Sequence, residues 1–134
     1  MSEQEPAETA ALVSEWRDLL ARHAAAACAL DRELGEHAGL GMSDFEVLER
    51  LAEAPADLRV QELAEKVHLS QSALSRLIGR LEKAGLLERS MCELDRRGIY
   101  VRLTEGGRER YRSARPVHRE VLARTLSGGL PGCS

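Results

Sequence analysis

The sequence predicts a single, mainly α-helical domain in which a helix-turn-helix is followed by a short β hairpin. Its 134 residues provide one hydrophobic core, since a second domain would need about 100 residues more. Leucine, alanine and valine must build this core, because the chain has only one Trp, two Tyr and one Phe, and this composition favours helices. Apolar residues follow helical spacing up to Gly85 and alternate only beyond it.

A long first helix is expected over residues 10–37, after a disordered polar tail at residues 1–9. Apolar residues recur there at helical spacing and form one stripe. The stripe consists of Leu12, Trp16, Leu19, Leu20, His23, Ala27, Leu30 and Leu34. Cys28 lies among alanines and is expected to be a small packed side chain.

Three further helices are expected before Gly85. Ser43 is a natural N-cap for the first of them, and Glu46 three residues later completes a capping box. A short helix is predicted over residues 60–67. Ser70 then caps a helix that runs to about Ala84, where Gly85 supplies a left-handed stop.

The pattern beyond Gly85 predicts a hairpin and a last helix. Residues 86–89 and 98–103 read as two short strands around a charged tip. Helix resumes over residues 105–126, with a kink or break at Pro116, and residues 128–134 form a tail rich in Gly and Pro.

These elements give one domain over residues 10–127. Its helix-turn-helix and wing occupy about residues 43–104, and the helices at 10–37 and 105–126 flank them. The fold class is therefore mainly α, a winged helix-turn-helix with a two-stranded β wing.

The helix that begins after Ser70 has one side suited to a protein core and one suited to DNA. At about 100 degrees per residue, its inward side consists of Leu74, Leu77, Ile78 and Leu81. Burying each of these side chains is worth about 1.5 to 3 kcal/mol, so this side must pack against the protein. The opposite side holds Ser72, Arg76, Gly79 and Lys83, flanked by Ser75 and Arg80, with Gln71 near the start.

This outward side predicts contact with a DNA major groove. Ser and Gln can hydrogen-bond base edges, and an arginine such as Arg76 can grip a guanine or a phosphate. The free backbone amides at Ser70 add a phosphate site at the positive end of the helix dipole. At the hairpin tip, Arg96 and Arg97 are expected to reach the minor groove, with Asp95 orienting one of them.

Charge is distributed unevenly along the chain. The net charge is −3, yet residues 1–58 hold 4 basic and 13 acidic side chains, whereas residues 59–112 hold 12 and 8. A basic surface can therefore exist on an acidic protein, and phosphate responds to the local patch.

The segment FEVLERLAEAPADLRVQELAEKVHLSQSALSRLIGRLEKAGLLERSMCELDRRGIYVRLTEGG, residues 45–107, resembles the MarR family of winged helix-turn-helix transcriptional regulators. The core of the match is Gln61-Glu62-Leu63-Ala64, Leu69-Ser70, Leu77, Arg80-Leu81-Glu82, Gly85-Leu86, Asp95-Arg96-Arg97 and Leu103-Thr104. The resemblance implies a homodimer whose outer helices intertwine, with one winged module on each half of a pseudo-palindromic operator in double-stranded DNA. It also implies a repressor, less often an activator, that is released by a small aromatic, often phenolic, ligand or by oxidation.

Two features differ from the usual family pattern. The family continues with a sixth helix that completes the dimer, where this sequence has SGGLPGCS. An arginine often follows the position of Arg89, and here that position is Ser90.

Other functions are less compatible with the sequence. No nucleophile-base pair, phosphate-cradling loop or metal cluster is visible, so we expect no catalytic residues, cofactor or metal. The histidines show no ligand spacing with a Cys or acid. The alternative function is a winged-helix protein-protein interaction module without sequence-specific DNA binding.

The three cysteines form an odd set without C-x-x-C spacing, which argues against a disulfide framework. Cys92 at the charged tip is a minor candidate for an oxidisable thiol. With no signal peptide or membrane-spanning stretch, the chain is expected to be cytoplasmic and to have no membrane partner.

Overall fold

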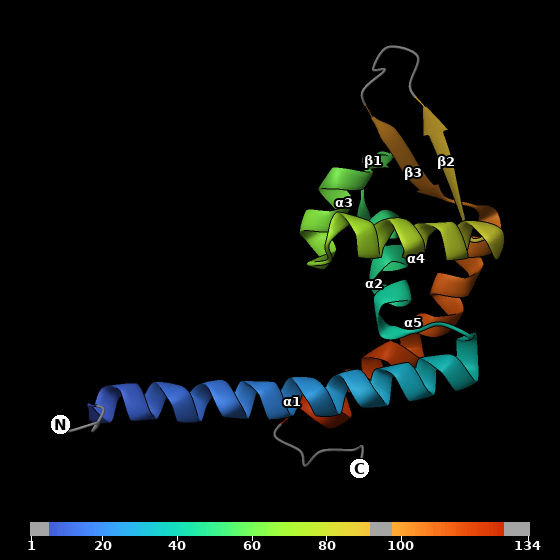
Figure 1. Cartoon of the computed structure of the whole chain (residues 1–134). Coiled ribbons are helices and arrows are strands. Elements are labelled where there is room, and N and C mark those ends of the chain that lie inside the picture. Colours follow the sequence, from blue (N-terminus) through green and yellow to red (C-terminus); the bar gives the residue numbers. More distant parts are fainter. Residues whose placement is uncertain (1–5, 92–97, 128–134) are drawn as a thin grey trace.

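The computed structural model describes residues 6–91 and 98–127 and confirms a mainly helical winged fold (Figure 1). Its elements are α1 (Ala7–Ala38), α2 (Met42–Glu53), β1 (Leu58–Arg59), α3 (Val60–Val67), α4 (Gln71–Lys83), β2 (Leu87–Met91), β3 (Ile99–Leu103) and α5 (Glu105–Leu126). In Figure 1, α1 runs along one side of the molecule, α5 packs on it, and the strands lie at the opposite end.

Helix α1 begins earlier than the sequence suggested. It starts at Ala7, so the prediction of a disordered tail up to residue 9 is wrong for residues 7–9; residues 1–5 lie outside the described ones. Gly39 ends the helix in the left-handed conformation, with φ of 66°. The first half of α1 projects past the rest of the protein in Figure 1.

The N-cap of helix α2 lies two residues before the predicted one. Gly41, not Ser43, is the N-cap, and the carboxylate of Asp44 accepts a hydrogen bond from the Gly41 backbone N at 2.8 Å. The carboxylate of Asp31 in α1 accepts from the backbone N of Met42 at 2.7 Å. This second bond joins the start of α2 to α1, which explains why the Ser43 and Glu46 box is not used.

The helix-turn-helix forms as predicted. Helix α3 ends at His68, which adopts the left-handed conformation with φ of 57°. Ser70 caps α4, since its side chain accepts from the backbone N of Ala73 at 3.2 Å. Gly85 follows α4 with φ of 79°, the left-handed stop that the sequence indicated.

The wing belongs to a three-stranded antiparallel sheet in the order β1-β3-β2, so the expectation of two strands was incomplete. Strand β1 is only two residues long, too short to show alternation, and pairs Leu58 with Val101 of β3. It lies directly before α3, so the sheet joins the wing to the helix-turn-helix.

Helix α5 begins at a tight joint with β2. Its N-cap, Thr104, accepts from the backbone N of Gly107 and donates to the carbonyl of Gly85. A Cβ at Gly107 would lie 2.1 Å from the carbonyl oxygen of Leu86, so this contact requires glycine. The helix continues through Pro116 to Leu126, and the predicted break at Pro116 does not occur.

One hydrophobic core joins all the helices to the sheet. Its largest fully buried side chains are Phe45, Leu34, Leu48, Leu63, Leu74, Ile78, Leu87, Val47, Val101 and Val121. The Phe45 ring stacks on His118 of α5 at 4.2 Å between centroids. The buried leucines and isoleucine of α4 belong to the same core, so α4 is anchored by its apolar side and its other side stays outside the core.

Candidate nucleic-acid interface

The outward side of α4 forms an exposed ridge, as predicted. We call the exposed Gln71, Ser72, Ser75, Arg76 and Lys83, with the half-buried Gly79, the α4 ridge. The four apolar residues of the inward side are all buried. The ridge carries two cations and three small or hydrogen-bonding side chains, a composition suited to base edges and phosphates. The exposed Glu82 lies beside it and is paired with Arg89.

The start of α4 has free donors next to this ridge. Ser70 is exposed and its hydroxyl already serves as the N-cap acceptor. Its oxygen also lies 3.3 Å from the hydroxyl of Ser72. The predicted phosphate site at Ser70 therefore depends on the backbone amides of the first turn and on hydroxyl hydrogens.

Arg80, predicted to flank the ridge, is engaged with an acid of α2. Its Nη1 donates to Oδ2 of Asp44 at 3.1 Å, and its Nη2 lies 3.0 Å from Oδ1. The Asp44 carboxylate raises the pKa of Arg80. Neither the distance in sequence nor any motif indicated this pair.

Arg89 of β2 is a cation that the sequence reasoning missed. Its Nε pairs with Glu82 of α4 at 3.3 Å. Its Nη2 lies 3.8 Å from where a Cβ on Gly79 would stand, so the guanidinium borders the middle of the ridge.

Arg59 of β1 is a second missed residue. Its Nε donates to the Tyr100 hydroxyl at 3.1 Å, and its guanidinium carbon lies 5.5 Å from the centroid of that ring. Arg59 and Arg89 line an open pocket of about 400 Å³ between the start of the α4 ridge and the base of the wing, together with Val60, Gln61, Gln71, Ser75, Gly98 and Ile99.

Three predicted site residues lie in a segment that the structure does not describe. Asp95, Arg96 and Arg97 lie outside the described residues, as does Cys92. Their expected roles at the wing tip stay predictions.

The apolar stripe on the first half of α1 is exposed in the single chain. Leu12, Trp16, Leu19 and Leu20 are between 46% and 64% accessible. Only later stripe residues such as Leu30 and Leu34 are buried. Four large apolar side chains on one helix side are an unusual surface for a chain that functions alone.

A second pocket, of about 680 Å³, lies where α1, α2 and α5 meet the helix-turn-helix. Its lining includes His23 of α1, Glu46 and Glu49 of α2, and His118 and Arg119 of α5.

A hydrogen-bond network centred on Glu49 closes one wall of this pocket. Tyr111 donates to Glu49 Oε2 at 2.8 Å, and Arg119 Nη2 donates to the same oxygen at 2.6 Å. Burial alone would raise the pKa of Glu49, but these bonds outweigh it and the pKa is lowered. For Tyr111, burial and the Glu49 contact raise the pKa. At neutral pH the carboxylate is therefore charged and the phenol is not.

His118 is held as a neutral acceptor. Burial lowers its pKa, and the nearby Arg119 lowers it further. Arg119 Nη1 lies 2.7 Å from His118 Nδ1, and a guanidinium can only donate, so the ring proton belongs on Nε2. The buried ring is stable in this network only while it stays uncharged.

Glu46, Glu49 and His118 could together supply three metal ligands, since their ligand atoms lie within 4.8 Å of one another. However, Arg119 already donates to both Glu49 and His118. A cation would have to displace this guanidinium, so the cluster is satisfied without an ion.

Stability is expected to fall as the pH drops from about 7 to 5, because the unfolded chain binds a proton at His118 before the folded one does. Urea denaturation at several pH values measures this. His118→Asn should flatten the pH dependence over that interval, even though it also removes packing. The exposed His37 offers a matched control, and a His37→Asn variant with an equally flattened profile would contradict the assignment to His118.

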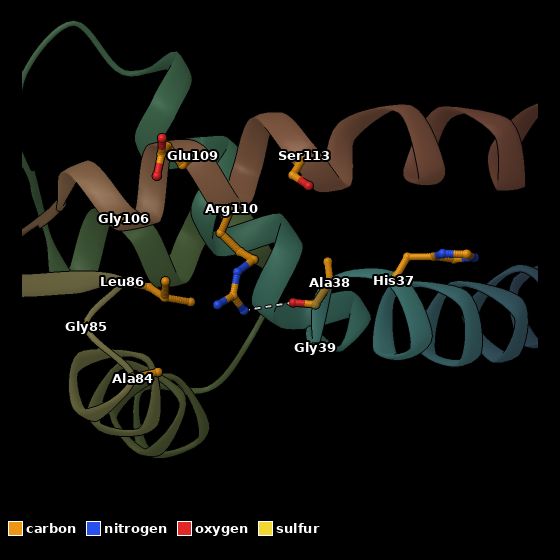
Figure 2. Close-up of a pocket in the computed structure, with 10 residues that line it drawn as sticks. All are labelled: His37, Ala38, Gly39, Ala84, Gly85, Leu86, Gly106, Glu109, Arg110 and Ser113. Carbon is orange, nitrogen blue, oxygen red and sulfur yellow. Dashed lines mark hydrogen bonds between the residues drawn. The ribbon is translucent and has the colours of Figure 1, made fainter.

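A third pocket, of about 710 Å³, is shown in Figure 2 between the ends of α1 and α4 and the start of α5. Arg110 points from α5 to the last turn of α1 and donates to the carbonyl of Ala38 at 2.8 Å. None of the predicted site residues lines this pocket. Arg110 satisfies a carbonyl at the end of α1, so its role here is to hold two helices together.

Cys28 differs from its prediction. It is exposed and takes part in a disulfide, whereas a packed thiol outside any disulfide was expected. The other two cysteines, Cys92 and Cys133, lie outside the described residues. Among the described helices, none combines the length and the apolar character that a membrane-spanning segment needs.

The helix-turn-helix with an exposed cationic second helix, followed by a β wing and flanked by long helices, defines a winged helix-turn-helix protein. Comparison with known proteins then places it more closely: the MarR family model matches residues 40–99. The chain belongs to the MarR family of transcriptional regulators.

Solved structures agree with this assignment over nearly the whole chain. AbsC, a MarR family transcriptional regulator from Streptomyces coelicolor, is 34% identical with a TM-score of 0.80, covering 95% of this chain and 83% of that one. Sco3205 from the same organism, a MarR family transcriptional regulator in complex with DNA, is 31% identical with a TM-score of 0.83, covering 98% and 82%.

A curated relative matches a shorter segment. The uncharacterized HTH-type transcriptional regulator YfiV of Bacillus subtilis is 44% identical over 69 residues, which are 52% of this chain and 43% of that protein. The chain therefore spans less than half the length of this relative.

Proposed function

We propose that this protein binds double-stranded DNA sequence-specifically as a homodimeric repressor, on a pseudo-palindromic operator, and is released by a small-molecule ligand or by oxidation. The α4 ridge is the observation that carries the proposal. An exposed face with Arg76 and Lys83, whose neighbouring acid Glu82 is paired with Arg89, stands opposite a fully buried apolar side on the second helix of a helix-turn-helix. The complex of Sco3205 with DNA supports the same use of the fold.

The residues proposed to contact DNA have distinct roles. Gln71, Ser72, Ser75 and Arg76 would face base edges, while Ser70, Arg80, Arg96 and Arg97 would contact phosphates or the minor groove. Asp95 would orient a wing arginine. Arg59 and Arg89 join this set because both border the ridge.

The dimer and the ligand are proposed from two further features. The exposed stripe from Leu12 to Leu20 supplies an apolar surface for a second copy of the chain. The pocket of about 680 Å³ between the flanking helices and the helix-turn-helix combines Leu30 and Leu122 with polar side chains, which suits a small aromatic or phenolic ligand. No catalytic residue is proposed.

Arg76→Ala should weaken binding to a preferred duplex by about 1 to 3 kcal/mol and reduce its preference over random DNA. The duplex is first selected from a random pool, and affinities are then measured by fluorescence anisotropy at several salt concentrations. Phenolic acids added to the same assay test ligand release.

Arg112→Ala, which removes an exposed arginine of α5, is the matched control and should bind as the wild type does. Equal losses for Arg76→Ala on preferred and random duplexes would contradict base reading. Wild-type protein that binds no duplex, or binds without any salt dependence, would favour the protein-protein interaction module.

A further inference from the structure

The pair formed by Asp44 and Arg80 joins two parts of the protein that otherwise have few direct contacts. Asp44 lies at the start of α2, and Arg80 lies on α4 beside the ridge. Both guanidinium nitrogens Nη1 and Nη2 lie against the carboxylate, at 3.1 Å from Oδ2 and 3.0 Å from Oδ1. The first contact is a hydrogen bond and the second is an ion-pair contact, and together they restrain the position of the guanidinium.

The two partners differ sharply in exposure. Asp44 is only 5% accessible, whereas the Arg80 side chain is 62% accessible. Asp44 Oδ2 also accepts from the backbone N of Gly41, but Oδ1 has no hydrogen-bond partner among the described residues. The charge on this buried oxygen is therefore compensated chiefly by Arg80, and removing the arginine would leave it unpaired.

Arg80 keeps donors for another partner. A guanidinium has five N–H groups in a fixed plane, and Asp44 occupies only one edge of it. Because most of the side chain is exposed, the remaining N–H groups are accessible beside the ridge. Such an oriented guanidinium is suited to a phosphate oxygen.

We propose that Asp44 is a positioning residue for DNA binding, which holds the Arg80 guanidinium in place to contact a backbone phosphate at the edge of the α4 ridge. This inference rests on the proposed function. A buried acidic residue, Asp44, would thus strengthen binding to DNA, although both are negatively charged. Asp44 itself does not touch the DNA.

The sign of the effect separates positioning from simple electrostatics. Removing a negative charge near DNA should strengthen binding if only the overall field matters. If Asp44 positions Arg80, its removal should weaken binding even though the protein becomes more positive.

The test measures anisotropy on the selected duplex with Asp44→Asn, Arg80→Ala, Arg80→Lys and the double variant. Asp44→Asn retains an oxygen for the Gly41 amide but loses the ion pair. We expect Asp44→Asn and Arg80→Ala each to bind about tenfold more weakly, the size of one charge-assisted hydrogen bond. The double variant should bind no more weakly than Arg80→Ala, because both changes remove the same contact.

Asp31→Asn is the matched control, since it makes the same charge change at the same helix junction without touching Arg80 and keeps an acceptor for Met42. It should bind DNA as tightly as the wild type, or slightly more tightly. Circular dichroism melting of each variant checks that the compared proteins are folded.

Arg80→Lys keeps the charge on an exposed side chain and removes the guanidinium that contacts both carboxylate oxygens, so it remains informative if Asp44→Asn fails to fold. Weaker binding by this variant supports positioning. Wild-type affinity for Arg80→Lys or for folded Asp44→Asn, or additive losses in the double variant, would overturn the inference. If wild-type protein bound no duplex at all, the proposed function would fail first.

Discussion

Gly107→Ala is expected to lower the free energy of unfolding by about 3 kcal/mol or more, or to prevent folding. The new methyl carbon would lie 2.1 Å from the backbone oxygen of Leu86. That oxygen cannot move freely, because it accepts a hydrogen bond from the Thr104 backbone N and belongs to a buried residue. Urea denaturation followed by circular dichroism measures the loss.

Gly106→Ala is the matched control for this prediction. A Cβ at Gly106 would meet its nearest atom, the carbonyl oxygen of Gly85, at 3.5 Å, which is an ordinary contact. Because alanine favours a helix more than glycine by about 0.5 to 1 kcal/mol, this variant should be as stable as the wild type or more so. Equal stability of both variants would show that the joint between β2 and α5 is looser than described.

Replacing Trp16 and Leu20 together by glutamate is expected to convert the proposed dimer to monomer and to weaken binding to a two-half-site duplex by about 100-fold or more. Two charges would face the partner's apolar surface, and the second winged module would no longer be held near the DNA. Both side chains are already exposed, so the fold of each chain should survive. Light scattering and anisotropy on the same samples measure both effects.

A double variant with Ser14→Glu and Ala21→Glu adds the same two charges on the other side of the exposed part of α1. It should remain a dimer and should lose far less DNA affinity. Dimers in the Trp16 and Leu20 variant, or monomers in the control, would place the interface elsewhere.

The helix-turn-helix was predictable because its signals are local. Ser70, Gly85 and the leucine spacing between them act within a few residues, and each has the predicted place. The start of α2 was mispredicted because two overlapping patterns, at Gly41 with Asp44 and at Ser43 with Glu46, both fit a cap. A bond from the distant Asp31 to Met42 accompanies the first of them.

The parts of the site that were missed depend on contacts across the fold. Arg80 and Asp44 are 36 residues apart, and Arg119 and Glu49 are 70 apart, so no spacing rule connects them. Arg89 reads as an ordinary strand residue until the sheet brings it against Gly79. Charge patterning correctly indicated a basic region but could not show which cations are already paired.

The first half of α1, which packs little against the rest of the chain, also affects how strongly two chains can associate. Most helical stability in proteins comes from tertiary packing of an apolar face, and in α1 the buried residues begin only at Ala25. Part of the favourable free energy of association then offsets the conformational entropy that this segment loses when it is ordered. The affinity between subunits should therefore be lower than the apolar area alone suggests, and dilution should reduce helix content together with assembly.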